Sequence, residues 1–193
     1  KRQGLSIDAS NDILHAQLGR GRKGEIKQGV SGHLRRTLPV ADLLHEFGVG
    51  VKLNTVVTDL NKDDDMSQIV RRIRPLRWKI FQALRIDGEN EEDIGELEVA
   101  DRAFETYVER HQQALADLLE TQVVAENNEA MLGTYAMIDP RGYVYTNAEG
   151  TYRYSSQTML EMGFSEAWNE VASGFSEAAF QARNGEWDWN REA

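Results

Sequence analysis

The sequence predicts an α/β protein whose first half is organised around a parallel sheet. Two mainly apolar segments of strand length, Gly48–Val57 and Arg77–Leu84, are separated by one amphipathic segment that ends before Pro75. A strand, a crossover helix and a second strand in this order place the two strands parallel in one sheet. The same alternation extends back to the start of the chain, which is the pattern of parallel α/β architecture.

The chain opens on a predicted strand, Gly4–Ala9, so we expect it to begin inside a domain. Ser10 or Asn11 then supplies the N-cap of a short helix over residues 12–18. The glycine-rich basic loop Gly19–Gly24 follows. Its glycines let the backbone approach a ligand closely and its arginines suit phosphate or carboxylate, although a flexible solvated loop is the alternative interpretation.

Residues 26–38 are polar and contain glycine, so they predict a loop. Pro39 then predicts the first turn of a helix that Gly48 ends. The apolar residues of this helix recur at helical spacing and predict its buried stripe: Val40, Leu43, Leu44 and Phe47.

The segment between the two strands predicts an amphipathic helix. Asp63 to Asp65 supply its N-cap and first-turn acids, and Pro75 stops it. Its inner face and its basic last turn are formed by residues at helical spacing: Met66, Ile69 and Ile73 inside, and Arg71, Arg72 and Arg74 at the end.

Both strands carry polar residues in an alternating pattern. Lys52 and Asn54 share one face of the first strand, and Arg77 and Lys79 share one face of the second. Cations are costly to bury without a partner, so this face either borders water at a sheet edge or lines a site for an anion. If the two strands are neighbours, three cations and an amide converge on one spot, which suits a phosphate or polyphosphate.

The second half predicts one long helix followed by short elements. The acidic, irregular stretch Arg85–Glu98 leads to the helix Asp101–Leu119, on which His111 is expected at the surface or the edge of the core rather than as a ligand. Asp139-Pro140-Arg141 marks the turn of a β-hairpin. The remaining elements, in order, are an extended segment, two hairpin strands and three short helices: Thr121–Val124, Thr134–Ile138, Gly142–Thr146, Gln157–Met162, Glu166–Ala172 and Ala178–Arg183.

Composition excludes several kinds of site and partner. The 193 residues include no cysteine, which excludes disulfides, thiolate metal sites and cysteine nucleophiles within this chain. The four histidines are widely scattered, so we expect no metal site. A net charge of −10 argues against nucleic-acid binding, while local basic clusters indicate a small anionic ligand. No apolar run of about 18 residues and no signal peptide occur, so we expect no membrane segment and a cytoplasmic location.

The block from Pro75 to Asn90, PLRWKIFQ followed by DGEN, is the most specific of several short motifs in this chain. The other motifs are Gly19-Arg20-Gly21, Lys52-Leu53-Asn54, Phe104, Glu109-Arg110-His111, Asn128, Met131, Tyr135 and Ser173-Gly174-Phe175. Together, and in this order, they resemble viperin, a family of radical S-adenosylmethionine (SAM) enzymes of antiviral defence. The resemblance covers nearly the whole chain and the C-terminal half or so of the family.

The resemblance implies a fold and an activity. The fold is a partial (β/α) TIM-like barrel of radical SAM type, with residues 1–100 in its C-terminal portion and residues 101–193 as a helix, hairpin and lid-like extension. In the family, a [4Fe-4S] cluster cleaves SAM to a 5′-deoxyadenosyl radical, which abstracts hydrogen from the ribose C4′ of a nucleoside triphosphate. Loss of water gives a 3′-deoxy-3′,4′-didehydro nucleotide, a chain terminator for viral polymerases. CTP is the expected substrate.

The resemblance also implies roles for single residues. Ser6 and Arg20 stand where the family contacts SAM, and Tyr135 stands where a tyrosine closes the nucleotide pocket. The positions that correspond to nucleotide contacts are Arg20, Lys52, Asn54, Arg77, Lys79, Asn128 and Tyr135. No catalytic residue is expected in this chain, because the CxxxCxxC motif that holds the cluster is expected in a segment that precedes it.

Two features depart from the vertebrate pattern. The segment between Arg20 and Lys52 is several residues longer, which indicates a distant member, fungal or prokaryotic. Vertebrate viperin ends in a tryptophan that the cytosolic iron–sulfur assembly machinery reads. Trp189 instead aligns with an internal tryptophan and is followed by Asn190–Ala193, so we do not expect that partner here.

Two other functions remain open from the residues. A Schiff-base lyase or aldolase on a (β/α) barrel would use Lys52 or Lys79 as its nucleophile, although the flanking Arg77 favours anion binding. A non-catalytic phosphate-binding or interaction module would present the acidic loop, residues 87–101, to a basic partner.

Overall fold

The computed structural model describes residues 1–186, which form two compact units. The first unit comprises Lys1–Ala83 and Glu96–Ala125, and the second comprises Leu84–Gly95 and residues 126–186. No helix among these residues combines the length and the apolar character that crossing a membrane requires. The C-terminal tryptophans, Trp187 and Trp189, lie outside the described residues.

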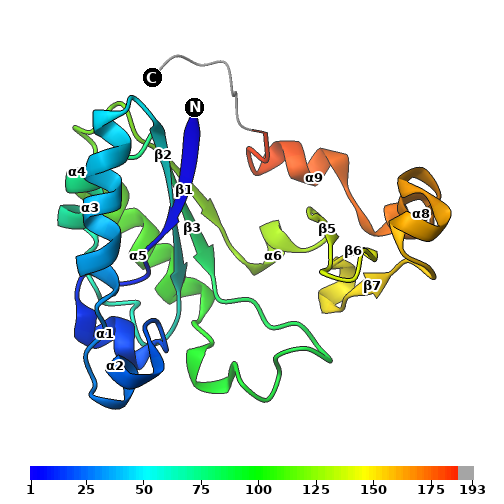
Figure 1. Ribbon diagram of the computed structural model, residues 1–193, viewed down its shortest axis with the longest axis horizontal. Helices are drawn as coiled ribbons and strands as arrows, with labels where there is room; N and C mark the ends of the chain where they lie inside the picture. The colour runs from blue at the N-terminus through cyan, green and yellow to red at the C-terminus, as the bar shows by residue number, and fades with distance from the viewer. Residues whose placement is uncertain (187–193) are drawn as a thin grey trace. The chain divides into compact units, whose positions relative to one another are not determined.

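The first unit contains the parallel sheet that the sequence predicts (Figure 1). Its strands lie in the order β1-β2-β3-β4, and the β1–β2 and β2–β3 pairs are parallel. The helices α3, α4 and α5 lie over one face of the sheet. The elements are β1 (Arg2–Ser6), α1 (Asp12–Gln17), α2 (Lys23–Lys27), α3 (His33–Glu46), β2 (Gly50–Val57), α4 (Ser67–Ile73), β3 (Arg77–Gln82), α5 (Asp101–Ala114) and β4 (Gln122–Glu126).

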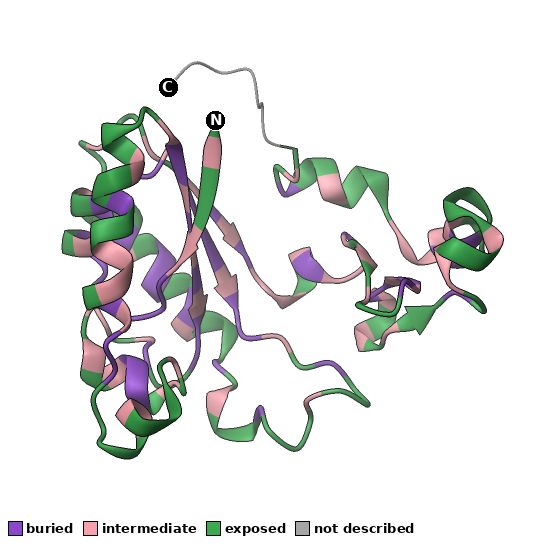
Figure 2. Cartoon of the chain, viewed as in Figure 1, coloured by how far each residue is buried: buried purple, intermediate pink, exposed green. Residues whose placement is uncertain are grey.

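Alternation along β2 and β3 separates an apolar face from a polar face. Val51 and Leu53 of β2 and Trp78 and Ile80 of β3 are fully buried and share one hydrophobic cluster with residues of the three covering helices. Figure 2 shows the buried positions along these two strands. The indole N–H of Trp78 donates to Thr55 Oγ1 at 2.9 Å, which satisfies its polar atom inside the core.

Helix α3 corrects the prediction of a loop over residues 26–38. It begins at His33 rather than at Pro39, which lies inside it. Side chains outside the helix cap its start: Asp12 Oδ1 accepts from Leu34 N at 3.0 Å, and Ser31 Oγ accepts from His33 N at 3.0 Å. Asp12 and Leu34 are distant in sequence, so a search for a capping residue next to the helix does not predict this start.

The buried stripe of α3 also differs from the prediction. The residues that pack into the core are Leu34, Leu38, Ala41 and Leu44. Val40, Leu43 and Phe47 are 43%, 51% and 73% exposed, so the prediction was right for Leu44 and wrong for these three. Because an α-helix has about 3.6 residues per turn, Leu34 and the residues that follow it at intervals of three or four positions line one side of α3, and this side faces the core. Val40, Leu43 and Phe47 lie outside this stripe. Gly48, with φ at +64°, follows the helix end as predicted.

Glu25 ties the basic loop to the start of α3. Its carboxylate accepts from both terminal nitrogens of Arg36, at 2.6 and 2.9 Å, and from the backbone N–H groups of Arg22 and Gly32. These hydrogen bonds, led by the one from the Arg36 side chain, lower the pKa of Glu25 to about 2. The loop that carries Arg20 is therefore anchored to its surroundings by an ion pair.

Two buried histidines are held as neutral side chains. His111 Nδ1 lies 2.7 Å from Tyr107 O, and its Nε2 accepts from Met66 N at 2.9 Å. His15 Nδ1 lies 3.0 Å from Asn11 O, and its Nε2 accepts from two backbone amides. Burial lowers the pKa of both histidines, because a charged imidazolium would lose its hydration.

We expect the intact protein to lose stability between pH 7 and pH 5, and the His111→Gln variant to lose less. The unfolded chain binds a proton on each histidine near pH 6.5, whereas the folded state binds it only at lower pH, because burial lowers the pKa of both residues. The stability is therefore fully present above this pH and falls as pH decreases toward the lowered native pKa. Each histidine contributes at most about 1.4 kcal/mol per pH unit. Urea unfolding at pH 7, 6 and 5 measures the effect; identical pH dependence in variant and wild type would contradict it.

The second unit is built on an antiparallel sheet. Strands β5 and β6 form the predicted hairpin, and β7 pairs with β6. Asp139 Oδ1 accepts from Arg141 N at 2.8 Å and from Tyr143 N at 3.0 Å, which fixes the turn. The elements are α6 (Asn128–Met131), β5 (Ala136–Ile138), β6 (Val144–Thr146), β7 (Arg153–Tyr154), α7 (Met159–Met162), α8 (Phe164–Val171) and α9 (Glu177–Ala182).

Gly174 allows the segment before α9 to pack closely on the hairpin. A Cβ atom at this position would clash with Thr146 Oγ1, so a larger residue would push the two segments apart. Two residues later, Ser176 N donates to Gly133 O at 2.8 Å. Gly174 belongs to the Ser-Gly-Phe segment noted in the sequence, and close approach is its physical reason.

Candidate functional site

The polar face of the sheet brings together the four residues predicted to grip phosphate. The strand register places Lys52 opposite Arg77 and Asn54 opposite Lys79. Ser6 of β1 lies opposite Asn54, so Ser6, Asn54 and Lys79 form one row across three strands. Side chains two residues apart on a strand share a face, so Lys52 and Arg77 form the neighbouring row.

This polar face lies opposite the helical layer. Arg77 and Lys79 are only 2% and 6% exposed, and Lys79 Nζ lies 4.9 Å from the ring centroid of Phe81 on the same face. Asn54 Oδ1 is buried with no hydrogen-bond partner among the described residues. A Cβ atom added at Gly4, which lies opposite Lys52, would meet no heavy atom within 4 Å. The face thus carries three cationic side chains, a buried amide oxygen without a described partner and open space at Gly4 of β1.

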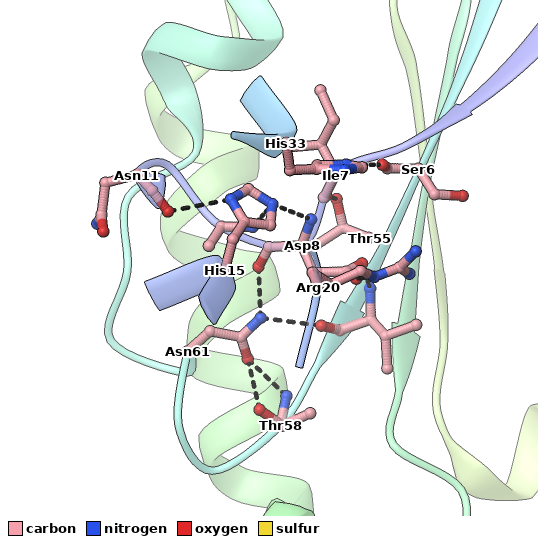
Figure 3. A network of polar contacts seen from close by, with 12 residues as sticks. Ser6, Ile7, Asp8, Asn11, His15, Arg20, His33, Thr55, Thr58 and Asn61 are labelled. Carbon is pink, nitrogen blue, oxygen red and sulfur yellow. Dashed lines mark hydrogen bonds and ion pairs between the residues drawn. The ribbon is translucent and has the colours of Figure 1, made fainter. Parts of the chain in front are cut away.

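A polar network at the carboxyl end of β1 holds Arg20 (Figure 3). Arg20 Nε donates to Asp8 Oδ2, and Val56 N donates to Asp8 Oδ1 at 2.9 Å. The Arg20 side chain is 38% exposed, and Asp8 is its one hydrogen-bond partner in the part of the chain that the structure describes. Its two terminal nitrogens remain available to a ligand, as the predicted contact with SAM or nucleotide requires.

Three residues of this network were not among the predicted site residues. Asn61 Nδ2 donates to Asp8 O at 2.6 Å, and its Oδ1 accepts from the backbone of Thr58. The rings of His15 and His33 lie with their centroids 4.8 Å apart and their planes inclined by 46°, and a ring nitrogen of His33 lies 2.8 Å from Ser6 O. The available signal was position: polar residues just after parallel strands gather at the edge where α/β proteins place their sites.

Tyr135 lies in a buried polar cluster of the second unit. Its hydroxyl donates to Glu126 Oε2, and Arg183 Nη1 donates to Glu126 Oε1 at 2.7 Å. The Arg183 guanidinium lies 4.4 Å from the Tyr135 ring centroid and also donates to Thr134 O at 2.9 Å. Burial and the hydrogen bond to Glu126 raise the pKa of Tyr135, so its hydroxyl stays protonated and acts as a donor.

Asn128 is the first residue of α6, next to the residue that caps this helix. The cap is Asn127, whose side chain accepts from Ala130 N at 2.8 Å. The structure therefore places the two predicted lid residues, Asn128 and Tyr135, in the second unit and the other six predicted residues in the first.

Comparison with known proteins identifies the relatives of this chain. No family model matches it. It is 34% identical over 187 residues to the S-adenosylmethionine-dependent nucleotide dehydratase of Flammeovirga pacifica, covering 96% of this chain and 59% of that protein. It is 31% identical over 192 residues to the S-adenosylmethionine-dependent nucleotide dehydratase RSAD2 of Oncorhynchus mykiss, covering 97% and 51%. The chain is homologous to part of the viperin-like nucleotide dehydratases.

This homology confirms the resemblance to viperin that the sequence indicates. The viperin-like relatives include an archaeal protein of the same name, from Thermoplasmatales archaeon (strain ISO4-H5), which is 34% identical over 139 residues and covers 72% of this chain. The chain spans about half the length of the curated relatives it matches, 59% and 51% in the two cases above.

Proposed function

We propose that the intact protein is a radical SAM nucleotide dehydratase and that this chain supplies its triphosphate-binding face. The observation that carries the proposal is the strand register that aligns Lys52 with Arg77 and Asn54 with Lys79 on one face of the sheet. A triphosphate is a dense polyanion, and three cations beside an amide suit its oxygens. The names of the homologous proteins support the same reaction class.

The residues of this chain fit SAM and the nucleotide but not the iron–sulfur cluster. Arg20 presents two terminal nitrogens, which match the carboxylate of SAM or a phosphate, and Ser6 lies in the row that contains Asn54 and Lys79. The chain has no cysteine, so it holds no thiolate ligand for a [4Fe-4S] cluster. We propose that these ligands lie elsewhere in the intact protein, which adopts a partial (β/α) barrel.

The proposed work of this chain is binding and orientation. SAM, when bound at the cluster, would supply the abstraction of the ribose C4′ hydrogen; departure of the 3′-hydroxyl as water, with uptake of one proton and of one electron from the reductant, would leave the 3′-deoxy-3′,4′-didehydro nucleotide. Lys52, Arg77 and Lys79 neutralise the triphosphate and thereby set the position of the ribose. For Asn128 and Tyr135 we propose contacts with the nucleotide. The proposed substrate is CTP, and the proposed product is an antiviral chain terminator.

The experiment that tests this function uses the intact protein reconstituted anaerobically with iron and sulfide. It is incubated with SAM, dithionite and each of CTP, UTP and GTP, and 5′-deoxyadenosine and nucleotide mass are followed. We expect 5′-deoxyadenosine to form in a CTP-dependent burst, together with a nucleotide lighter by one water. SAM cleavage that is equal with and without any nucleotide would overturn the dehydratase assignment. Borohydride trapping of a lysine adduct with a carbonyl substrate would favour the Schiff-base lyase instead.

A further inference from the structure

Asp8 is a buried carboxylate whose four polar atoms are all engaged. Its side chain binds Arg20 Nε through Oδ2 and Val56 N through Oδ1. Its backbone N–H donates to His15 Nε2 at 3.3 Å, and its carbonyl accepts from Asn61 Nδ2 at 2.6 Å. Asp8 is only 5% exposed. Figure 3 shows these contacts converging on it from β2, α1 and the loop after β2. Such a residue has little freedom to move.

Arg20 is held on one side and open on the other. The contact with Asp8 uses Nε, so the fork formed by the two terminal nitrogens points to no partner among the described residues. A guanidinium binds an oxyanion best through two parallel N–H groups, which requires its plane to be set in advance. A single hydrogen bond that Nε donates to a carboxylate with little freedom to move restrains that plane.

We propose that Asp8 is a positioning residue that orients Arg20 toward an oxyanion of a bound ligand. The inference rests on the proposed function, which makes Arg20 a ligand contact. The oxyanion has two possible sources, the carboxylate of SAM and a phosphate of the nucleotide, and the two share the same planar recognition chemistry. Asp8 itself does not touch the ligand; it acts through the guanidinium.

Replacement of Asp8 has two opposite effects on the affinity for an anionic ligand. Removal of a carboxylate beside Arg20 increases the local positive charge, so electrostatics alone would strengthen the binding of an anion. Loss of orientation weakens it, because the ligand must then immobilise a long, flexible side chain. We expect orientation to dominate, so that Asp8→Asn weakens binding by about threefold to tenfold. The asparagine keeps an acceptor for Val56 N but turns no negative charge toward Arg20.

The experiment titrates SAM and CTP separately into the intact, reconstituted and unreduced protein by isothermal titration calorimetry. The variants are Asp8→Asn, Arg20→Ala and the two together. Asp64→Asn is the matched control. It removes a carboxylate that accepts hydrogen bonds from Ser10, two residues after Asp8, and that makes no hydrogen bond with Arg20 among the described residues. Thermal unfolding of every variant reports folding. If Asp8→Asn does not fold, Arg20→Lys, which keeps the charge but loses the fork, carries the test.

We expect Asp8→Asn and Arg20→Ala to weaken the same ligand, and the double variant to bind it no more weakly than Arg20→Ala alone. A loss confined to SAM identifies the carboxylate, and a loss confined to CTP identifies the phosphate. Unchanged or tighter binding in Asp8→Asn, additive losses, or an equal loss in Asp64→Asn would overturn the inference. If Arg20→Ala changes neither ligand while CTP still binds, only this inference fails. If the wild type binds neither ligand, the proposed function fails with it.

Discussion

Replacement of Lys52 and Lys79 together by alanine is expected to weaken CTP binding to the intact protein by roughly a hundredfold or more. Each lysine would lose a charge-assisted hydrogen bond worth about 1.5–3 kcal/mol, and about 1.4 kcal/mol is a tenfold change in Kd. The two side chains lie in neighbouring rows of one sheet face, where a single triphosphate can reach both. Calorimetric titration of the unreduced protein with CTP and with SAM measures the two affinities.

The control for this prediction removes the same charge from the opposite side of the sheet. Arg71→Ala combined with Arg72→Ala takes two cations from α4, where both pair with acidic residues at the exposed surface. We expect a small effect on CTP, because exposed charges at a distance are screened by salt. SAM binding should be nearly unchanged in both double variants. An equal loss of SAM and CTP in the lysine variant would indicate misfolding and undercut the assignment of the two lysines.

Glu126→Leu is expected to destabilise the second unit by about 3–5 kcal/mol, because it leaves the charge of Arg183 buried without its partner. Glu126 is fully buried, and only 5% of the Arg183 side chain is exposed. The same change removes the acceptor of the Tyr135 hydroxyl, which adds an unsatisfied polar group. Urea unfolding of the intact protein measures the loss, and hydrogen exchange over residues 126–186 localises it.

The double variant Glu126→Leu, Arg183→Met separates charge from packing. Removal of both charges leaves an apolar pair of similar size, so most of the lost stability should return. Tyr135→Phe measures the share that belongs to the hydroxyl alone. A double variant that is as unstable as the sum of the two single variants would show that packing, rather than the unpaired charge, explains the loss.

The cationic face was predictable because every signal behind it is local. Alternation along a strand decides which side chains share a face, and one helix between two strands decides that they are parallel. Lys52 and Asn54 therefore share a face, as do Arg77 and Lys79, and the strand register pairs the two groups. The hairpin around Asp139 was predictable for the same reason, since its turn residues are adjacent in sequence.

The polar clusters were not predictable because they join residues far apart in the chain. Arg20 contacts Asp8 across 12 positions, and Glu126 contacts Arg183 across 57. His111 looked like a surface or core-edge residue on its helix, yet it is fully buried, with its ring 5.3 Å from that of Trp78 on another element. The spacing of residues along one helix gives no information about which side chains of other elements pack against it.

By itself, the sequence determined the α/β class, the parallel strands, the shared face of the three cations and the resemblance to viperin. All of these follow from the period of two along a strand, from the order of elements and from short blocks of residues. Only the tertiary structure decided where α3 begins, which of its sides is buried and which partner holds each buried polar group. Those outcomes depend on burial and hydrogen bonds between distant segments, and such contacts exist only after the chain has folded.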